Sequence, residues 1–289
     1  MLWNIYLLEL KRNIKSWPFV IFTLLLFAGT FYYISSTEQG VTFLYVTITK
    51  EWHNAPIVIA KLMAGYTLIG VLITMIMVGG TVTRDFSAKT HDFFFTIPMK
   101  RSSYLWGRFL GGYTANVLIF SGVVAGFFAA TLLLEPQYYG PFTLRSFLNP
   151  LLFIVIPNLF FTGAIFFSLA TLTRNMIMTY ISGVIFFMIY VLASIGASKI
   201  ENQTVQMLMD PFGVAAMTSL TKYWTVADMN LNQMPLAGGF LLNRIIWLGI
   251  SFGIMIFTWK RFRFTSILEK KRQRKKMNGI QADAIPFSV

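Results

Sequence analysis

Residues 151–172 read LLFIVIPNLFFTGAIFFSLATL, and residues 176–197 read MIMTYISGVIFFMIYVLASIGA. Neither run contains a charged side chain. Both are long enough to cross the hydrocarbon core of a bilayer, which a helix does in about 20 residues. Only Thr173, Arg174 and Asn175 separate them. This stretch therefore predicts two successive transmembrane helices joined by a short polar turn.

Four further runs on either side have the same character. They lie at residues 17–34, 63–82, 109–134 and 240–259. None alternates in the ten-residue pattern of a membrane barrel, whereas a helix satisfies its own backbone polar groups in lipid. The sequence predicts an all-α polytopic membrane protein with six transmembrane helices in residues 17–259.

The composition agrees with this fold class. The 289 residues are 56% hydrophobic, 17% aromatic and only 12% charged, which excludes an ordinary soluble domain and a disordered chain. The absence of Cys excludes disulfides, thiolate zinc sites and cysteine nucleophiles.

The net charge of +13 is unevenly distributed along the chain. If the N-terminus is inside, eighteen of the 24 Lys and Arg residues fall in inside segments, nine of them in residues 260–276. Basic residues favour the cytoplasmic side, so both termini are predicted to be cytoplasmic, with 260–289 as a basic tail. We interpret this charge as a topology signal that also attracts anionic lipid, and no nucleic-acid partner is predicted.

Residues 1–16 form the pattern of an amphipathic helix. One face carries Trp3, Tyr6, Leu7, Leu10 and Ile14 at three- and four-residue steps. This predicts an N-terminal interfacial helix that lies in the headgroup plane and leads into the first span. A cleaved signal peptide is the alternative, but no small-x-small cleavage site ends the apolar run.

The loop after the second span is the most informative segment for function. Residues 84–103 read RDFSAKTHDFFFTIPMKRSS, with three consecutive Phe at 93–95. Three aromatic side chains in a cytoplasmic loop are unfavourable in water, so we expect the bilayer surface or a protein surface to bury them. A loop folded against the protein's own helix ends is one solution. We favour the other, a short helix at about 84–100 presented to a partner.

The 198–239 segment is too long and too apolar for a simple connector. We expect short helices there that re-enter the outer leaflet. Two cations, Lys61 and Arg244, lie near span ends, where snorkelling is the expected behaviour. The alternatives are a transport role for Lys61 and a polar substrate path lined by Arg244. Gly122 and Gly126 form a small-xxx-small pair that predicts close helix packing.

Several classes of chemistry lack their usual residues. No acid or His lies in the core of a span, and His53 and His91 are expected to be solvated loop residues. There is no H-E-x-x-H metal motif and no G-x-x-x-x-G-K-[ST] phosphate loop. The chain is therefore predicted to be no enzyme, with no catalytic, cofactor-binding or metal residues, and its energy source is external or absent.

This layout resembles the permease subunits of ATP-binding-cassette transporters of the type-2 exporter family. The most specific part runs from Arg84-Asp85 through Thr96-Ile97-Pro98 to Arg101 and the Y-L-x-G-R element at 104–108. The likeness extends over nearly the whole chain, including the amphipathic lead-in, the six spans and the long external segment.

The resemblance implies a cytoplasmic coupling helix that docks on a separate ATPase subunit. The implied interface residues are Lys89, Asp92, Phe93, Phe94, Phe95 and Arg101. It also implies a dimer of ATPase subunits that binds ATP and Mg²⁺, a second identical or paralogous permease chain, export as the direction, and the bacterial cytoplasmic membrane as the location. The alternatives are an ATP-independent carrier or channel, and a scaffold subunit of a membrane complex.

Overall fold

The computed structural model describes residues 1–36, 42–43, 46–48, 50–87, 100–133, 135–197 and 200–262. Six helices in these ranges are long and apolar enough to cross a membrane, which confirms the predicted fold class. They span Trp17–Ser35, Pro56–Arg84, Arg101–Thr131, Arg145–Thr173, Met176–Ala197 and Gly238–Arg261.

Three spans are single helices and three are built from consecutive segments. The single helices are α2 (Trp17–Ser35), α10 (Met176–Ala197) and α14 (Gly238–Arg261). The second span joins α3 (Pro56–Thr74), the π-helical turn η1 (Met75–Gly79) and α4 (Gly80–Ser87). The third joins α6 (Arg101–Ile119) and α7 (Ser121–Thr131), and the fourth joins α8 (Arg145–Pro150), the π-helical turn η3 (Leu151–Val155) and α9 (Ile156–Thr173).

The wide turn η3 lies beside a proline. Pro157 has no N–H to donate to the carbonyl four residues earlier, so the regular helical ladder cannot continue across it. Tyr113 on α6 donates its hydroxyl to the Ile156 carbonyl at 2.9 Å. The fourth span is therefore irregular where it contacts the third.

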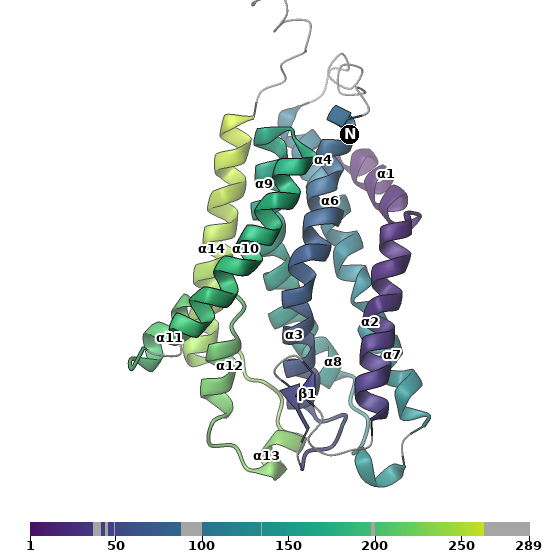
Figure 1. Cartoon of the computed structure of the whole chain (residues 1–289), viewed down its shortest axis with the longest axis vertical. Helices are drawn as coiled ribbons and strands as arrows, with labels where there is room; N and C mark the ends of the chain where they lie inside the picture. Colours follow the sequence, from purple (N-terminus) through teal and green to yellow (C-terminus); the bar gives the residue numbers. More distant parts are fainter. Residues whose placement is uncertain are drawn as a thin grey trace, which may run out of the picture.

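Shorter elements close the two ends of the bundle. They are α1 (Leu2–Ile14), the antiparallel pair β1 (Thr42–Phe43) and β2 (Val46–Thr47), the 3₁₀ turn η2 (Pro136–Tyr138), α11 (Gln203–Met209), α12 (Val214–Thr221) and α13 (Val226–Leu231). In Figure 1, α1, α4 and the last turn of α14 lie at one end, here called the α1 end. The strand pair, α8 and α13 lie at the other, here called the α13 end.

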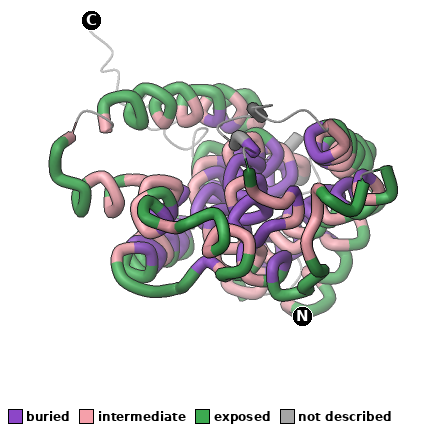
Figure 2. The backbone as a smooth tube through the Cα atoms, turned by 90° about the horizontal axis from the view of Figure 1, so that it is seen from below, coloured by how far each residue is buried: buried purple, intermediate pink, exposed green. Residues whose placement is uncertain are grey.

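The core of the bundle is formed by the second and fourth spans. Figure 2 shows the buried backbone at the centre and the exposed backbone at the periphery. Helix α9 contacts α3, α6, α10 and α14, whereas α10 itself is exposed along most of its length. The outer faces of α2, α10 and α14 carry large apolar side chains, as expected of surfaces that meet lipid or another membrane helix.

Candidate functional site

The segment predicted to contact a partner is described only at its two ends. Helix α4 ends at Ser87 and the chain is described again from Lys100, so Lys89, Asp92, Phe93, Phe94 and Phe95 lie outside the described residues. Arg101 is the first residue of α6 and is exposed at the α1 end. Its Nη1 donates to the Phe262 carbonyl oxygen at 3.4 Å.

Three spans meet around Phe262, which is 2% exposed. The Tyr104 ring of α6 stacks on the Phe262 ring with centroids 6.0 Å apart. Arg174, in the turn between α9 and α10, has its guanidinium carbon 5.9 Å from the centre of the same ring. Burial lowers the pKa of Arg174 from its ordinary value, and the charge of Tyr104 acts in the opposite direction. The third and sixth spans are thus joined next to the predicted interface.

A cluster of charged side chains connects α1 to both sides of this segment. Glu9 on α1 is fully buried, and its Oε1 accepts a hydrogen bond from Arg84 Nη2 at 2.8 Å. Its Oε2 accepts from Arg108 Nη1. Asn13, one turn further along α1, donates to Glu9 Oε1 at 3.1 Å and accepts from Arg84 Nη2 at 2.9 Å. Arg84 belongs to α4 and Arg108 to α6.

Glycines on α6 allow this close approach. A Cβ added at Gly107 would lie 2.8 Å from the Cβ of Ile5, and one added at Gly111 would lie 2.6 Å from the Cβ of Glu9. Any larger side chain at these positions would push α1 away from α6. The two helices are therefore in contact at backbone level.

The buried face of α1 differs from the expected one. The apolar side chains of Trp3 and Leu7 are 62% and 43% exposed, while Glu9 and Asn13 are buried. The apolar face is thus exposed on the outside of the protein, and the polar pair contacts the helical bundle. The location of α1 in the headgroup plane remains a prediction.

Arg244 does not snorkel, and that prediction is wrong. The residue is 4% exposed, and its Nη1 donates to Asn158 Oδ1 on α9 at 2.6 Å. Its Nε donates to Asn243 Oδ1 at 3.1 Å and its Nη2 to the Pro211 carbonyl at 3.3 Å. These acceptors provide inside the protein the hydrogen bonds that water would provide outside. Lys61 is half-buried in the second turn of α3, and its snorkelling remains a prediction.

His53 is not the solvated loop residue that the sequence predicts. It is 4% exposed, its backbone N–H donates to the Tyr138 carbonyl at 2.9 Å, and its ring Nδ1 lies 3.1 Å from the same oxygen. The ring also meets the Tyr138 ring edge-on. His53 therefore attaches the loop before α3 to η2. His91 lies outside the described residues.

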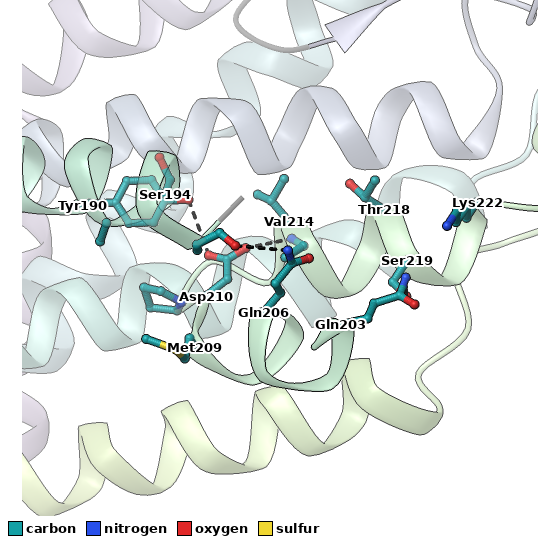
Figure 3. A pocket seen from close by; sticks show the side chains of 14 residues that line it. Tyr190, Ser194, Gln203, Gln206, Met209, Asp210, Val214, Thr218, Ser219 and Lys222 are labelled. Carbon is teal, nitrogen blue, oxygen red and sulfur yellow. Dashed lines mark hydrogen bonds between the residues drawn. The ribbon is translucent and has the colours of Figure 1, made fainter. Parts of the chain in front are cut away.

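A cavity of about 350 Å³ lies between α10, α11 and α12 (Figure 3). Its walls include Ala193, Met209 and Val214, and the picture places Tyr190 and Lys222 at opposite ends. The Asp210 carboxylate accepts from the backbone N–H groups of Phe212 at 2.9 Å and Ala215 at 2.8 Å. With this charge satisfied internally, the cavity offers apolar walls, the polar side chains of Ser194, Gln206 and Thr218 among others, and the Lys222 cation, at a size usual for small-ligand sites.

A comparison with protein families identifies the chain. Residues 3–232 match the family described as ABC-2 family transporter protein, and this match covers most of the 289 residues. The chain belongs to the ABC-2 transporter family. No curated protein matches the sequence. The ABC-2 protein is thus a multi-pass membrane component of an ABC transporter. Transporters of this class include an ATPase partner.

Sequence reasoning missed the polar residues that hold this ABC-2 protein together. Glu9 and Asn13 stand one helical turn apart, which is a visible signal, but nothing local indicates that Arg84 and Arg108 are their partners. Among the described residues, no group of three or more His, Asp or Glu side chains could hold a metal ion. The helices on either side of the predicted interface, α4 and α6, can hold it in position, and the exposed Arg101 provides a positive charge beside it.

Proposed function

We propose that this protein is the permease subunit of an ATP-driven exporter. The family match over residues 3–232, on a chain with six membrane-crossing helices, is the observation that carries the proposal. ATP and Mg²⁺ bind to a separate ATPase subunit, since the chain has no phosphate loop of its own. A second permease chain, identical or paralogous, completes the pathway, and the bacterial cytoplasmic membrane is the location.

The segment at 84–100 is the coupling element of this proposal. Phe93, Phe94 and Phe95 form the apolar anchor, and Lys89, Asp92 and Arg101 form its polar rim. A few buried aromatic residues inside a polar rim carry most of the energy of a typical protein interface. The burial of Tyr104 and Phe262 beside Arg101 supports the proposal. These contacts join the third and sixth spans next to the segment, so a docked ATPase subunit could move whole helices.

The test is copurification of the ATPase subunit with a tagged permease. We expect Phe94→Asp to weaken the association about thirtyfold, the effect of losing a hot-spot residue of roughly 2 kcal/mol. The matched control is Tyr223→Asp, which places the same charge at a residue that is 86% exposed, in the loop between α12 and α13. Membrane insertion should be equal in both variants, and unchanged copurification of Phe94→Asp would remove the aromatic anchor from the proposal.

A second measurement separates the exporter from an ATP-independent carrier or channel. The permease alone, reconstituted in liposomes, is expected to show neither a steady conductance nor uphill transport. Either result in the absence of an ATPase would contradict the proposed function.

A further inference from the structure

We propose that Glu9 is the positioning residue that sets the separation between the two ends of the coupling segment. The proposal rests on the function inferred above, because it concerns how that segment is held for its partner. It adds a residue on α1, far away in sequence, to an element that sequence reasoning confines to residues 84–100.

The geometry that carries this inference is the sharing of one carboxylate between two helices. Arg84 on α4 is the first residue of the segment at 84–100, and Arg108 follows the segment on α6. The Oε1 atom of Glu9 binds Arg84 Nη2 at 2.8 Å, and the Oε2 atom binds Arg108 Nη1. Glu9 therefore bridges α4 and α6, the two helices on either side of the segment.

Burial makes the bridge specific. The side chains of Glu9 and Arg108 are 0% and 1% exposed, so the carboxylate cannot replace a lost Arg108 guanidinium with bulk water. Arg84 is 33% exposed, and Arg12, whose Nη2 lies 3.8 Å from Glu9 Oε1, is 38% exposed. A buried ion pair usually stabilises a fold no more than apolar side chains of equal size would, and its best-attested benefit is to fix one arrangement among several. Gly112 on α6 packs directly on Val78 and Thr81, and the Glu9 bridge fixes the arrangement of α4 and α6 one turn closer to the segment.

The packing of α1 determines how the bridge transmits force. Gly107 and Gly111 bring α1 and α6 into contact at backbone level, so these two helices move together. Arg84 joins them from α4, through Glu9 and through Asn13 Oδ1 at 2.9 Å. A pull on the segment that displaces α4 from α6 must break the Arg84 contacts or carry α1 with it. The bridge converts a local pull into movement of α1, α4 and α6 as one unit.

The test measures the separation directly. Because the chain has no Cys, spin labels can be attached specifically at Ser87→Cys and Lys100→Cys, the residues that bracket the segment. We expect one narrow distance distribution in the otherwise unchanged permease and a broad or shifted one with Glu9→Gln. Glu201→Gln, a matched change at an exposed glutamate near α11, should leave the distribution narrow.

Two further variants keep the proposal open to refutation if Glu9→Gln folds poorly. Asn13→Ala removes one acceptor of Arg84 and retains the Glu9–Arg108 pair, so a smaller broadening is expected. Glu9→Asp retains the charge and should restore part of the narrow distribution. Distributions identical to that of the unchanged protein in the folded Glu9 variants would overturn the inference.

The complex with its ATPase subunit supplies the functional readout. In the unchanged complex, we expect the label separation to be the same without nucleotide and with a non-hydrolysable ATP analogue. Glu9→Gln should still copurify the ATPase and hydrolyse ATP, but its label separation should differ between these two states. A purely structural role would lower the yield and leave the separation the same in both states, and that result in the folded variant would contradict the proposal. If the unchanged permease copurifies no ATPase, the proposed function fails, while the label separation in the isolated permease still tests Glu9.

Discussion

Arg244 shows how one side chain can organise the α13 end of the bundle. Its guanidinium connects α14 to Asn158 on α9 and to the Pro211 carbonyl in the loop between α11 and α12. Gly213 in that loop has φ +73° and lies against Arg244 Nη2, so a side chain there would be strained and would clash. Asn158 in turn donates to Thr67 Oγ1 at 3.0 Å and to the Phe212 carbonyl at 3.1 Å.

We predict that Arg244→Met destabilises the protein by about 2 kcal/mol, because buried acceptors on Asn158 and Asn243 lose their donor. The measurement is the thermal unfolding midpoint in detergent. Arg145→Met is the control, since Arg145 is an exposed first residue of α8. Equal midpoints for the two variants would show that the Arg244 hydrogen bonds contribute no net stability.

At the scale of elements, the third span is the surface on which the N-terminal helices rest. Gly107 and Gly111 face α1, whereas Gly122 and Gly126 face the backbone carbonyls of Thr23 and Phe27 on α2. The close packing predicted from the Gly122 and Gly126 spacing is therefore confirmed. In a lipid environment, where apolar side chains gain little by leaving their surroundings, such backbone approach provides the dispersion contacts that hold helices together.

We predict that Gly126→Ala destabilises the protein by about 2 kcal/mol, the usual cost of forcing an extra methyl group into a packed contact. Gly249→Ala is the matched control, because a Cβ added at Gly249 on α14 meets nothing within 4 Å. Both variants add the same methyl group to a transmembrane helix. A lowered unfolding midpoint for Gly126→Ala alone is the expected result, and equal midpoints would contradict the packing interpretation.

The six spans could be predicted from the sequence because each depends on a continuous apolar run. Their limits were less accurate: the second span was predicted at 63–82 and extends over Pro56–Arg84, because the apolar residues before Lys61 were left outside the predicted span. The short strands β1 and β2 and the turns η1 and η3 were also missed. Of the predicted interface, only Arg101 lies in the described part of the chain, so its role stays a prediction.

At the scale of the whole molecule, burial of polar side chains is what the sequence could not reveal. His53 and Arg244 were expected to reach water and no burial was predicted for Glu9, yet all three are buried. Arg84 and Arg108 lie 75 and 99 residues from Glu9, Tyr138 lies 85 residues from His53, and Asn158 lies 86 residues from Arg244. Local sequence patterns cannot identify partners at such separations. Composition predicts that a segment enters the membrane, whereas tertiary contacts decide which polar side chains are buried inside the protein.

The arrangement of the ends makes a prediction about orientation. Helix α1 and the end of α14 lie together at the α1 end in Figure 1, and these two elements carry the described basic residues Lys11, Arg12, Lys260 and Arg261. Because basic residues favour the cytoplasmic side, we expect this end to face the cytoplasm and the α13 end to face outward.

Single-cysteine variants of the Cys-free chain test this orientation with a maleimide that does not cross membranes. In intact cells, Gln137→Cys and Tyr223→Cys should react, because both residues are exposed in segments joined to the α13 end. Lys11→Cys and Lys260→Cys, also at exposed residues, should react only after the cells are opened. If Lys11→Cys and Lys260→Cys react in intact cells and the other two variants react only after the cells are opened, the orientation is the opposite of the predicted one. Reaction of Lys11→Cys and Lys260→Cys on opposite sides would contradict an even number of crossings. Helix α1 and the end of α14 could then not both lie on the side of the membrane where the ATPase docks on residues 84–100.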